Sequence, residues 1–324
     1  MTRAGAVVAA AAFAVLCLLP AGLAPGDVRT MTSVLLFATL ASAWNIIGGF
    51  AGYASFGNVA FFGLGGYSVA VLMTKASWPF LPSVAVAAVL SAAFAALVGL
   101  PVLRLRGHYF AIATLGVAEG LREVVVNLPR LTGGGAGITI PTLGARATTH
   151  YPGTTGFYWY ALAVLVAAVA VSAAVSGSRF GYGLRAIQLD EAAAASVGVR
   201  TTAAKLAAFA LSAALTALAG GVFAFQQVTI YPERLFSVEI TVLMVVMAVL
   251  GGAATVSGPV VGAFTLRLLD EYLRRHFLGT HLIVFGAIIV AAVVFLPQGV
   301  VRCSADAWRE RRLGLLDTVR AYRL

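Results

Sequence analysis

The chain has 324 residues, of which 60% are hydrophobic and only 10% are charged, and its mean hydropathy is +0.95. About 25% of the residues of a soluble domain are charged, so this chain carries too few charges to cover a water-facing surface. Its net charge of +10 is typical of basic residues that flank membrane spans. No basic stripe with interleaved aromatic residues occurs, so nucleic-acid binding is not indicated. The composition predicts an all-α, polytopic integral membrane helical bundle in a lipid bilayer.

Hydrophobic segments of about 20 residues, the length that crosses a bilayer, recur along the chain. They run approximately over residues 4–23, 31–47, 54–74, 80–103, 109–128, 157–178, 203–225, 235–253, 257–273 and 279–296. We expect about eight to ten transmembrane helices, some of them broken or, within residues 235–273, re-entrant. The first segment resembles a signal peptide. Because Pro25 would stand beside the cleavage point and hinder cleavage, we expect this segment to be retained as a span.

The arginine and lysine residues indicate how the spans are oriented. With the N-terminus in the cytoplasm and the spans alternating, most basic residues fall on the cytoplasmic side, as the positive-inside rule requires. The cluster Arg274, Arg275 and His276 falls on the external side, against this trend. We therefore expect both termini in the cytoplasm, with residues 1–300 in the cell inner (plasma) membrane and residues 301–324 as a basic cytoplasmic tail.

Two loops between the spans are distinctive. The external loop, residues 129–156, is rich in glycine and threonine, whereas the cytoplasmic loop, residues 179–202, is rich in helix formers. The cytoplasmic loop predicts a surface helix of about three to four turns between Leu184 and Val197. Its apolar residues fall near one side: Leu184, Ile187, Ala194 and Val197. Gly183 and Gly198 allow the chain to turn at the ends of this helix. Three polar residues provide contacts: Arg185, Asp190 and Glu191.

No residues with the spacing of a catalytic, metal or nucleotide site occur in the sequence. Cys17 and Cys303 form no metal pattern, and the four histidines are scattered. A P-loop needs a Gly-Lys pair followed by Ser or Thr, and neither Lys75 nor Lys205 follows a glycine. We therefore expect a chain that is not an enzyme and that binds no cofactor directly.

Charged residues inside predicted spans are informative because burying them in hydrocarbon is costly. Glu119, Arg122 and Glu123 share one helix face, so they form either a polar lining of a pathway or a structural ion pair. Glu239 has only Arg234 as a local partner, and a pathway role for it stays open. Four further residues have the spacing of an ion-paired helix end: Asp270, Glu271, Arg274 and Arg275.

The stretch 48–67 is unusually rich in glycine. Gly48 and Gly52 form a G-x-x-x-G pair, which lets helices approach closely. The glycines also permit a broken helix whose backbone faces a cavity, with dense packing as the alternative. A similar pattern, Gly251-Gly252 followed by Ser257, Gly258 and Gly262, leaves an internal repeat open. Four amide side chains are expected to bond between helices: Asn45, Asn58, Gln226 and Gln227.

Seven blocks of the sequence resemble, in order, the LivM-type permease subunits of the branched-chain amino acid ABC importers. The blocks are residues 52–63, 103–115, 131–134, 184–198, 205–209, 239–252 and 296–299. The chain departs from the family at Tyr53 and Asn58, where members often carry Gln and His. This departure leaves the solute open among leucine, isoleucine and valine, other amino acids, amides, urea and small acids.

The resemblance implies a permease that moves small amino acids by alternating access. Its implied partners are two cytoplasmic ATPases that use ATP and magnesium, a second LivH-type permease or a second copy of this chain, and an external solute-binding protein. The loop 179–202 would be the coupling helix that contacts an ATPase. The candidate residues of the translocation pathway are Gly52, Tyr53, Ser55, Gly57, Asn58, Glu119 and Glu239. The alternatives are a secondary transporter or channel working without ATPases and a structural membrane scaffold.

Overall fold

The computed structural model of this chain describes residues 3–142, 149–277, 280–295 and 299. Ten of the described helices have 15 residues or more, and together they occupy all ten predicted spans. These helices are α1 Arg3–Gly22, α2 Pro25–Asn45, α3 Asn58–Lys75, α4 Phe80–Val102, α5 His108–Val126, α7 Gly153–Gly177, α10 Thr201–Gln227, α12 Val238–Gly252, α13 Gly258–His276 and α14 His281–Phe295. The predicted tail, residues 301–324, and Cys303 lie outside the described residues.

Shorter elements connect these helices. They are the π-helical turn η1 Ile46–Phe50, the helices α6 Pro129–Thr132, α8 Arg179–Leu189, α9 Glu191–Ser196 and α11 Pro232–Leu235, the 3-10 turn η2 Gly134–Ala136, and the strands β1 Ile138–Thr139 and β2 Thr229–Ile230. The two strands pair antiparallel, with Ile138 opposite Ile230, and so tie the predicted external loop to the end of α10.

Five segments of the described chain are long and apolar enough to cross a membrane. They are Pro25–Phe50, Phe80–Val102, Gly153–Gly177, Thr201–Gln227 and Pro232–Gly252. Helix α13 is less apolar because its second half carries five charged residues, Arg267, Asp270, Glu271, Arg274 and Arg275. The predicted all-α polytopic bundle is therefore confirmed.

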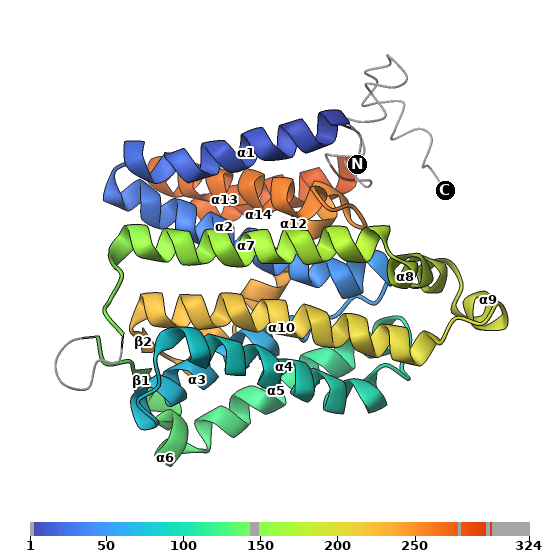
Figure 1. Cartoon of the computed structure of the whole chain (residues 1–324), viewed down its shortest axis with the longest axis horizontal. Helices are drawn as coiled ribbons and strands as arrows, with labels where there is room; N and C mark the ends of the chain where they lie inside the picture. The colour runs from blue at the N-terminus through green and yellow to red at the C-terminus, as the bar shows by residue number, and fades with distance from the viewer. Residues whose placement is uncertain (1–2, 143–148, 278–279, 296–298, 300–324) are drawn as a thin grey trace.

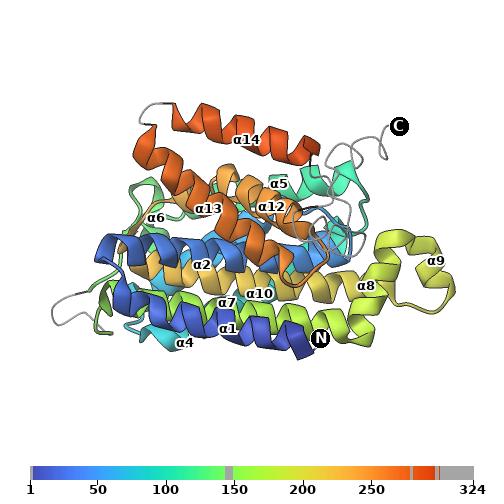
Figure 2. The ribbon, with the colours of Figure 1, turned by 90° about the horizontal axis from the view of Figure 1, so that it is seen from above.

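The long helices run side by side along one direction (Figure 1). Helix α2 lies inside the bundle, where it contacts α7, α10, α12 and α13, and most of its apolar residues are buried. Figure 2 shows α14 at one edge of the bundle and α1 and α4 at the opposite edge. The hairpin of α8 and α9 projects beyond one end, here called the α9 end, and β1 and β2 lie at the other, the β1 end.

Helices α3 and α10 cross so closely that their glycines leave no room for a side chain. A Cβ atom added to Gly220 would lie within 2.1 Å of the carbonyl oxygen of Phe62, and one added to Gly65 within 2.4 Å of that of Ala217. The neighbours are backbone atoms, which cannot move aside without separating the helices. Dense packing therefore accounts for part of the glycine content of stretch 48–67.

The other part of that stretch is a break in the helix. Helix α2 continues into η1, the chain turns at Gly52 with φ +74°, and α3 begins only at Asn58. Residue 54 therefore lies outside the helix, although span 54–74 was predicted to be helical from there. The indole of Trp44 donates to the carbonyl of Ser55 at 2.8 Å and holds the irregular segment. The predicted broken helix is confirmed, and we call residues 51–57 the break.

The second glycine-rich stretch packs against the first. Helices α12 and α13 form a hairpin whose turn contacts Asn45 at the end of α2. The Asn45 amide donates to the carbonyl of Thr255 at 2.8 Å, and its oxygen accepts from the N–H of Ala254 at 2.9 Å. A second predicted interhelical bond also forms, because Asn58 donates to Ser212 at 2.9 Å. Both predictions for asparagine are therefore confirmed.

The loop 179–202 folds differently from the prediction of one helix between Leu184 and Val197. It forms two helices, α8 and α9, that are separated at Asp190, whose backbone is extended with φ −157° and ψ 113°. The carboxylate of Asp190 accepts from the N–H groups of Ala192 and Ala193 and caps α9. An aspartate with two free N–H groups ahead of it favours this cap over a continuous helix.

Candidate functional site

Glu191, the first residue of α9, joins four segments of the chain at the α9 end. Its carboxylate accepts hydrogen bonds from the Lys205 ammonium and from the Tyr53 hydroxyl, each at 2.6 Å. The Lys205 ammonium also donates to the Tyr53 hydroxyl at 2.9 Å and to the carbonyl of Leu103 at 3.0 Å. The guanidinium of Arg106 lies 3.3 Å from the carboxylate on its exposed side. We call Tyr53, Arg106, Glu191 and Lys205 the Glu191 cluster.

The cluster is largely closed to solvent. The side chain of Lys205 is 4% exposed and that of Glu191 14%. Burial by itself raises the pKa of the Glu191 carboxyl, but the bonds from Lys205 and Tyr53 and the charges of Lys205 and Arg106 outweigh it, so the pKa is lowered. The carboxylate therefore stays ionised and ties α9 to the break, to α10 and to the end of α4.

The residues predicted to face an ATPase divide into an inner and an outer set. Leu184 and Ile187 are buried against the bundle, and the Arg185 guanidinium donates to Ser176 at 2.6 Å and lies over the ring of Phe50. These three hold α8 in place. Asp190 caps α9, and its pKa is lowered by the two N–H bonds that it accepts.

Two large apolar side chains are exposed at the tip of this hairpin. Leu189 is 88% exposed and Val197 78% exposed, so Val197 does not share the buried side of the loop with Ala194 as predicted. It lies after α9, where Gly198 turns the chain with φ +90°. Gly183, predicted at the turn before the helix, lies within α8 instead. The tip of the α8–α9 hairpin therefore presents large apolar side chains beyond the end of the bundle.

Five of the predicted pathway residues come together in or beside the break. Tyr53 enters the Glu191 cluster, Ser55 is bound by Trp44, and Asn58 is bound to Ser212. Gly52 lies against Gln188 of α8, and a Cβ there would meet that side chain at 2.9 Å. Gly57 lies against the backbone of Thr114, where a Cβ would meet the carbonyl oxygen at 2.7 Å. The break is thus packed directly under the α8–α9 hairpin.

Glu119 lies away from this group. It is half exposed on α5 and forms a 2.8 Å ion pair with Arg122, which also pairs with Glu123 at 2.9 Å. The geometry is that of the structural ion pair, one of the two alternatives that the sequence left open. Glu119 therefore shares no contact with the break or with Glu239.

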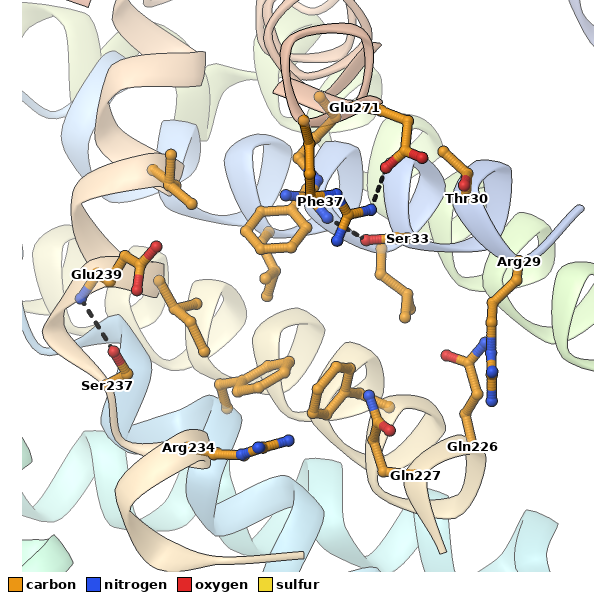
Figure 3. A pocket seen from close by; sticks show the side chains of 18 of the residues that line it. Arg29, Thr30, Ser33, Phe37, Gln226, Gln227, Arg234, Ser237, Glu239 and Glu271 are labelled. Carbon is orange, nitrogen blue, oxygen red and sulfur yellow. Dashed lines mark hydrogen bonds and ion pairs between the residues drawn. The ribbon is translucent and has the colours of Figure 1, made fainter. Parts of the chain in front are cut away.

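Glu239 lies in a second place, a cavity of about 820 Å³ towards the β1 end. Figure 3 shows its carboxylate on one wall, Arg29 on the opposite wall and Arg234 between them. The walls come from α2, α3, α10, α11, α12 and α13 and from Ser237, between α11 and α12. Gln226 and Gln227, which were expected to bond between helices, line this cavity instead.

Ion pairs fix the wall formed by α13. Arg267 binds Asp270 at 2.9 Å and Ser33 at 2.7 Å, and its guanidinium lies over the ring of Phe37. Glu271 pairs with Arg274 and with Arg275, and Arg275 also binds Asp27 at the start of α2. The predicted ion-paired helix end is therefore confirmed, with Arg267 as an additional member.

Sequence reasoning missed Lys205, Arg106 and Arg267 as parts of these two places. The signal for Lys205 was available, since an isolated lysine near the start of an otherwise apolar helix requires a partner. Its acidic partner stands 14 residues earlier in another helix, and no local spacing rule connects them. Within the part of the chain that the structure describes, no group of three or more His, Cys, Asp or Glu side chains is placed to hold a metal ion.

Comparison with known proteins then identifies the family. The model of a family described as "branched-chain amino acid transport system / permease component" matches residues 28–293. This chain belongs to that family. The matched range includes the break, the α8–α9 hairpin, the Glu191 cluster and every residue that lines the cavity except Gly26. The chain is therefore a multi-pass membrane permease component rather than an enzyme.

Curated relatives agree with the family. The chain is 30% identical to the high-affinity branched-chain amino acid transport system permease protein LivM of Salmonella typhimurium, over 84% of this chain and 69% of the relative. It is 29% identical to the protein of the same name of Escherichia coli, over 85% and 69%. It is 23% identical to a probable LivM permease of Methanocaldococcus jannaschii, over 68% and 67%. No solved structure matches the chain significantly.

Proposed function

We propose that this chain is the membrane permease subunit of an ABC importer that moves branched-chain amino acids into the cell. The family match over residues 28–293 carries the proposal, and relatives named as high-affinity branched-chain amino acid permeases support it. Family members often carry Gln and His where this chain has Tyr53 and Asn58, which leaves the solute open. The printed names of the relatives make leucine, isoleucine and valine the first solutes to test.

The proposed partners are two cytoplasmic ATPases, a second permease and an external solute-binding protein. A permease without a P-loop lysine has to receive the energy of ATP through contact. The α8–α9 hairpin supports such a contact because it projects from the bundle and exposes Leu189 and Val197 (Figures 1 and 2). In this arrangement ATP and magnesium are bound by the partners, and movement of the hairpin would be passed to the break through Glu191.

Uptake by the reconstituted importer tests the proposal. The permeases and ATPases are placed in proteoliposomes, the solute-binding protein is added outside, and radioactive leucine is followed. We expect uptake only with ATP and magnesium inside the vesicles, and competition by isoleucine and valine. Uptake that proceeds without ATP would instead identify a secondary transporter. Uptake of urea or a dicarboxylate without competition from leucine would contradict the proposed solute class.

The proposed orientation places the α9 end in the cytoplasm. Figures 1 and 2 show the start of α1 and the α8–α9 hairpin at the same end of the bundle. The larger share of the arginine and lysine residues in the sequence, with those of residues 301–324, falls on the side predicted to be cytoplasmic. Single cysteines at the exposed positions Ser196 and Ser77 in a cysteine-free chain test it. An impermeant thiol reagent applied to intact spheroplasts is expected to label Ser77→Cys and not Ser196→Cys. Labelling of Ser196→Cys and not of Ser77→Cys would contradict the proposed orientation and place the α9 end outside.

A further inference from the structure

The cavity of about 820 Å³ towards the β1 end holds charges of both signs that form no ion pair with any described residue. Arg267, Arg274 and Arg275 are already bound to acidic side chains. Arg29, Arg234, Glu233 and Glu239 also line the cavity, and among the described residues their side chains form no ion pair or hydrogen bond. Two cations and two anions therefore line one cavity without an ion pair among the described residues.

The remaining wall of the cavity has polar residues, among them Ser33, Gln226 and Gln227, and an apolar part. The apolar part includes Leu36, Leu40, Phe62, Phe223 and Leu243, and Figure 3 shows apolar side chains between Arg234 and the helix of Ser33. Opposite charges at the edge of an apolar wall are complementary to a molecule that has a carboxylate, an ammonium group and an aliphatic side chain. An apolar pocket with a few convergent polar groups is the usual form of a small-molecule site.

We propose that this cavity is a binding site for the zwitterionic amino acid within the permease itself. Arg234 would bind the carboxylate, because a guanidinium forms two parallel hydrogen bonds with that group. Glu239 would bind the ammonium group from the neighbouring wall, and Leu36, Leu40 and Leu243 would contact the aliphatic side chain. The inference deepens the proposed function and rests on it.

The position of Glu239 suits this role. Glu239 stands in the first turn of α12. Its backbone N–H donates to the hydroxyl of Ser237, which caps the start of this helix. A capped helix start fixes the backbone of residue 239, so the direction of the carboxylate is preorganised. The site is nevertheless wide enough to hold water beside an amino acid, and we expect weak binding that allows the solute to leave.

Protection of a single cysteine tests the site directly. The reporter is Gln227→Cys, on the cavity wall (Figure 3), in the complex of permeases and ATPases without the solute-binding protein. L-leucine is expected to slow labelling of this cysteine several-fold. Leucinamide, which lacks the carboxylate, and 4-methylpentanoate, which lacks the ammonium group, are expected to protect much less. Equal protection by either analogue would contradict recognition of a zwitterion.

Variants then assign the two charges. Arg234→Gln and Glu239→Gln are each expected to raise the leucine concentration needed for half protection by about tenfold or more, because each variant loses at least one charge-assisted hydrogen bond. Glu119→Gln, an acid on α5 outside the cavity, is the matched control and is expected to change nothing. Labelling of Ser77→Cys, also outside the cavity, is expected to be insensitive to leucine.

The outcomes separate this inference from the proposed function. An importer that takes up leucine while Gln227→Cys is unprotected at every concentration would contradict only the binding site. An importer that takes up no branched-chain amino acid would contradict the proposed function. Unchanged protection in both Arg234→Gln and Glu239→Gln would show that these two side chains do not bind the solute.

Discussion

The substitution Lys205→Met is expected to reduce uptake by about tenfold or more while the permease remains inserted and assembled. Lys205 contacts the other three segments of the Glu191 cluster at once: α9, the break and the end of α4. Its loss leaves the largely buried Glu191 carboxylate without its buried cationic partner. Removing one partner of a buried pair costs about 3–5 kcal/mol, somewhat less here because Arg106 remains.

Loss of this contact separates the hairpin from the segment that it is proposed to move. We therefore expect the rate of ATP hydrolysis to become independent of the loaded solute-binding protein. The measurement is uptake together with ATPase activity in proteoliposomes. The matched control is Arg200→Met. Arg200 is an exposed cation directly before α10, and it forms no ion pair among the described residues. Equal uptake in Lys205→Met and Arg200→Met would show that the cluster does not transmit movement.

A second test removes both charges of the pair. Glu191→Leu combined with Lys205→Met leaves no unpaired buried charge, so its stability should lie closer to wild type than that of Lys205→Met alone. Its uptake should nevertheless stay low, because α9 is still detached from the break. Recovery of both stability and uptake in the double variant would mean that the cluster stabilises the fold and does nothing more.

The substitution Gly220→Ala is expected to destabilise the folded permease strongly. The new methyl group would lie 2.1 Å from the carbonyl oxygen of Phe62, and the two nearest further atoms also belong to the backbone of Phe62. Helices α3 and α10 would have to separate along their whole crossing. Overpacking of this kind costs about 1–3 kcal/mol when side chains can move, and more is expected where backbone blocks the way.

The matched control for this prediction is Gly116→Ala on α5. A Cβ atom there meets nothing within 4 Å, so the change should be neutral or slightly stabilising, since alanine favours a helix by about 1 kcal/mol over glycine. Thermal denaturation of the detergent-solubilised protein, followed by fluorescence-detected size exclusion, compares the two. A melting temperature of Gly220→Ala equal to that of Gly116→Ala would disprove the close crossing.

The sequence alone was sufficient to predict the membrane class, the ten helices and the broken helix near Gly52. Each of these features follows from local composition: a bilayer span needs about 20 apolar residues, and a cluster of glycines permits irregular backbone. The family could also be recognised, because its seven blocks are short local patterns. The split of the loop at Asp190 was within reach too, because an aspartate before a helical segment is a recognised cap.

Only the tertiary structure decided which distant residues meet. Glu191 was predicted as an outward contact, yet its carboxylate turns inwards to Lys205 and Tyr53, a position that depends on how α9 folds back over α10. Arg29 and Glu239 share a cavity although they are far apart in the chain, because α2 and α12 pack side by side. A charge inside an apolar protein requires a partner. The sequence shows that a partner is needed, but not which residue it is. The partner is set by the packing of whole helices, which no local pattern encodes.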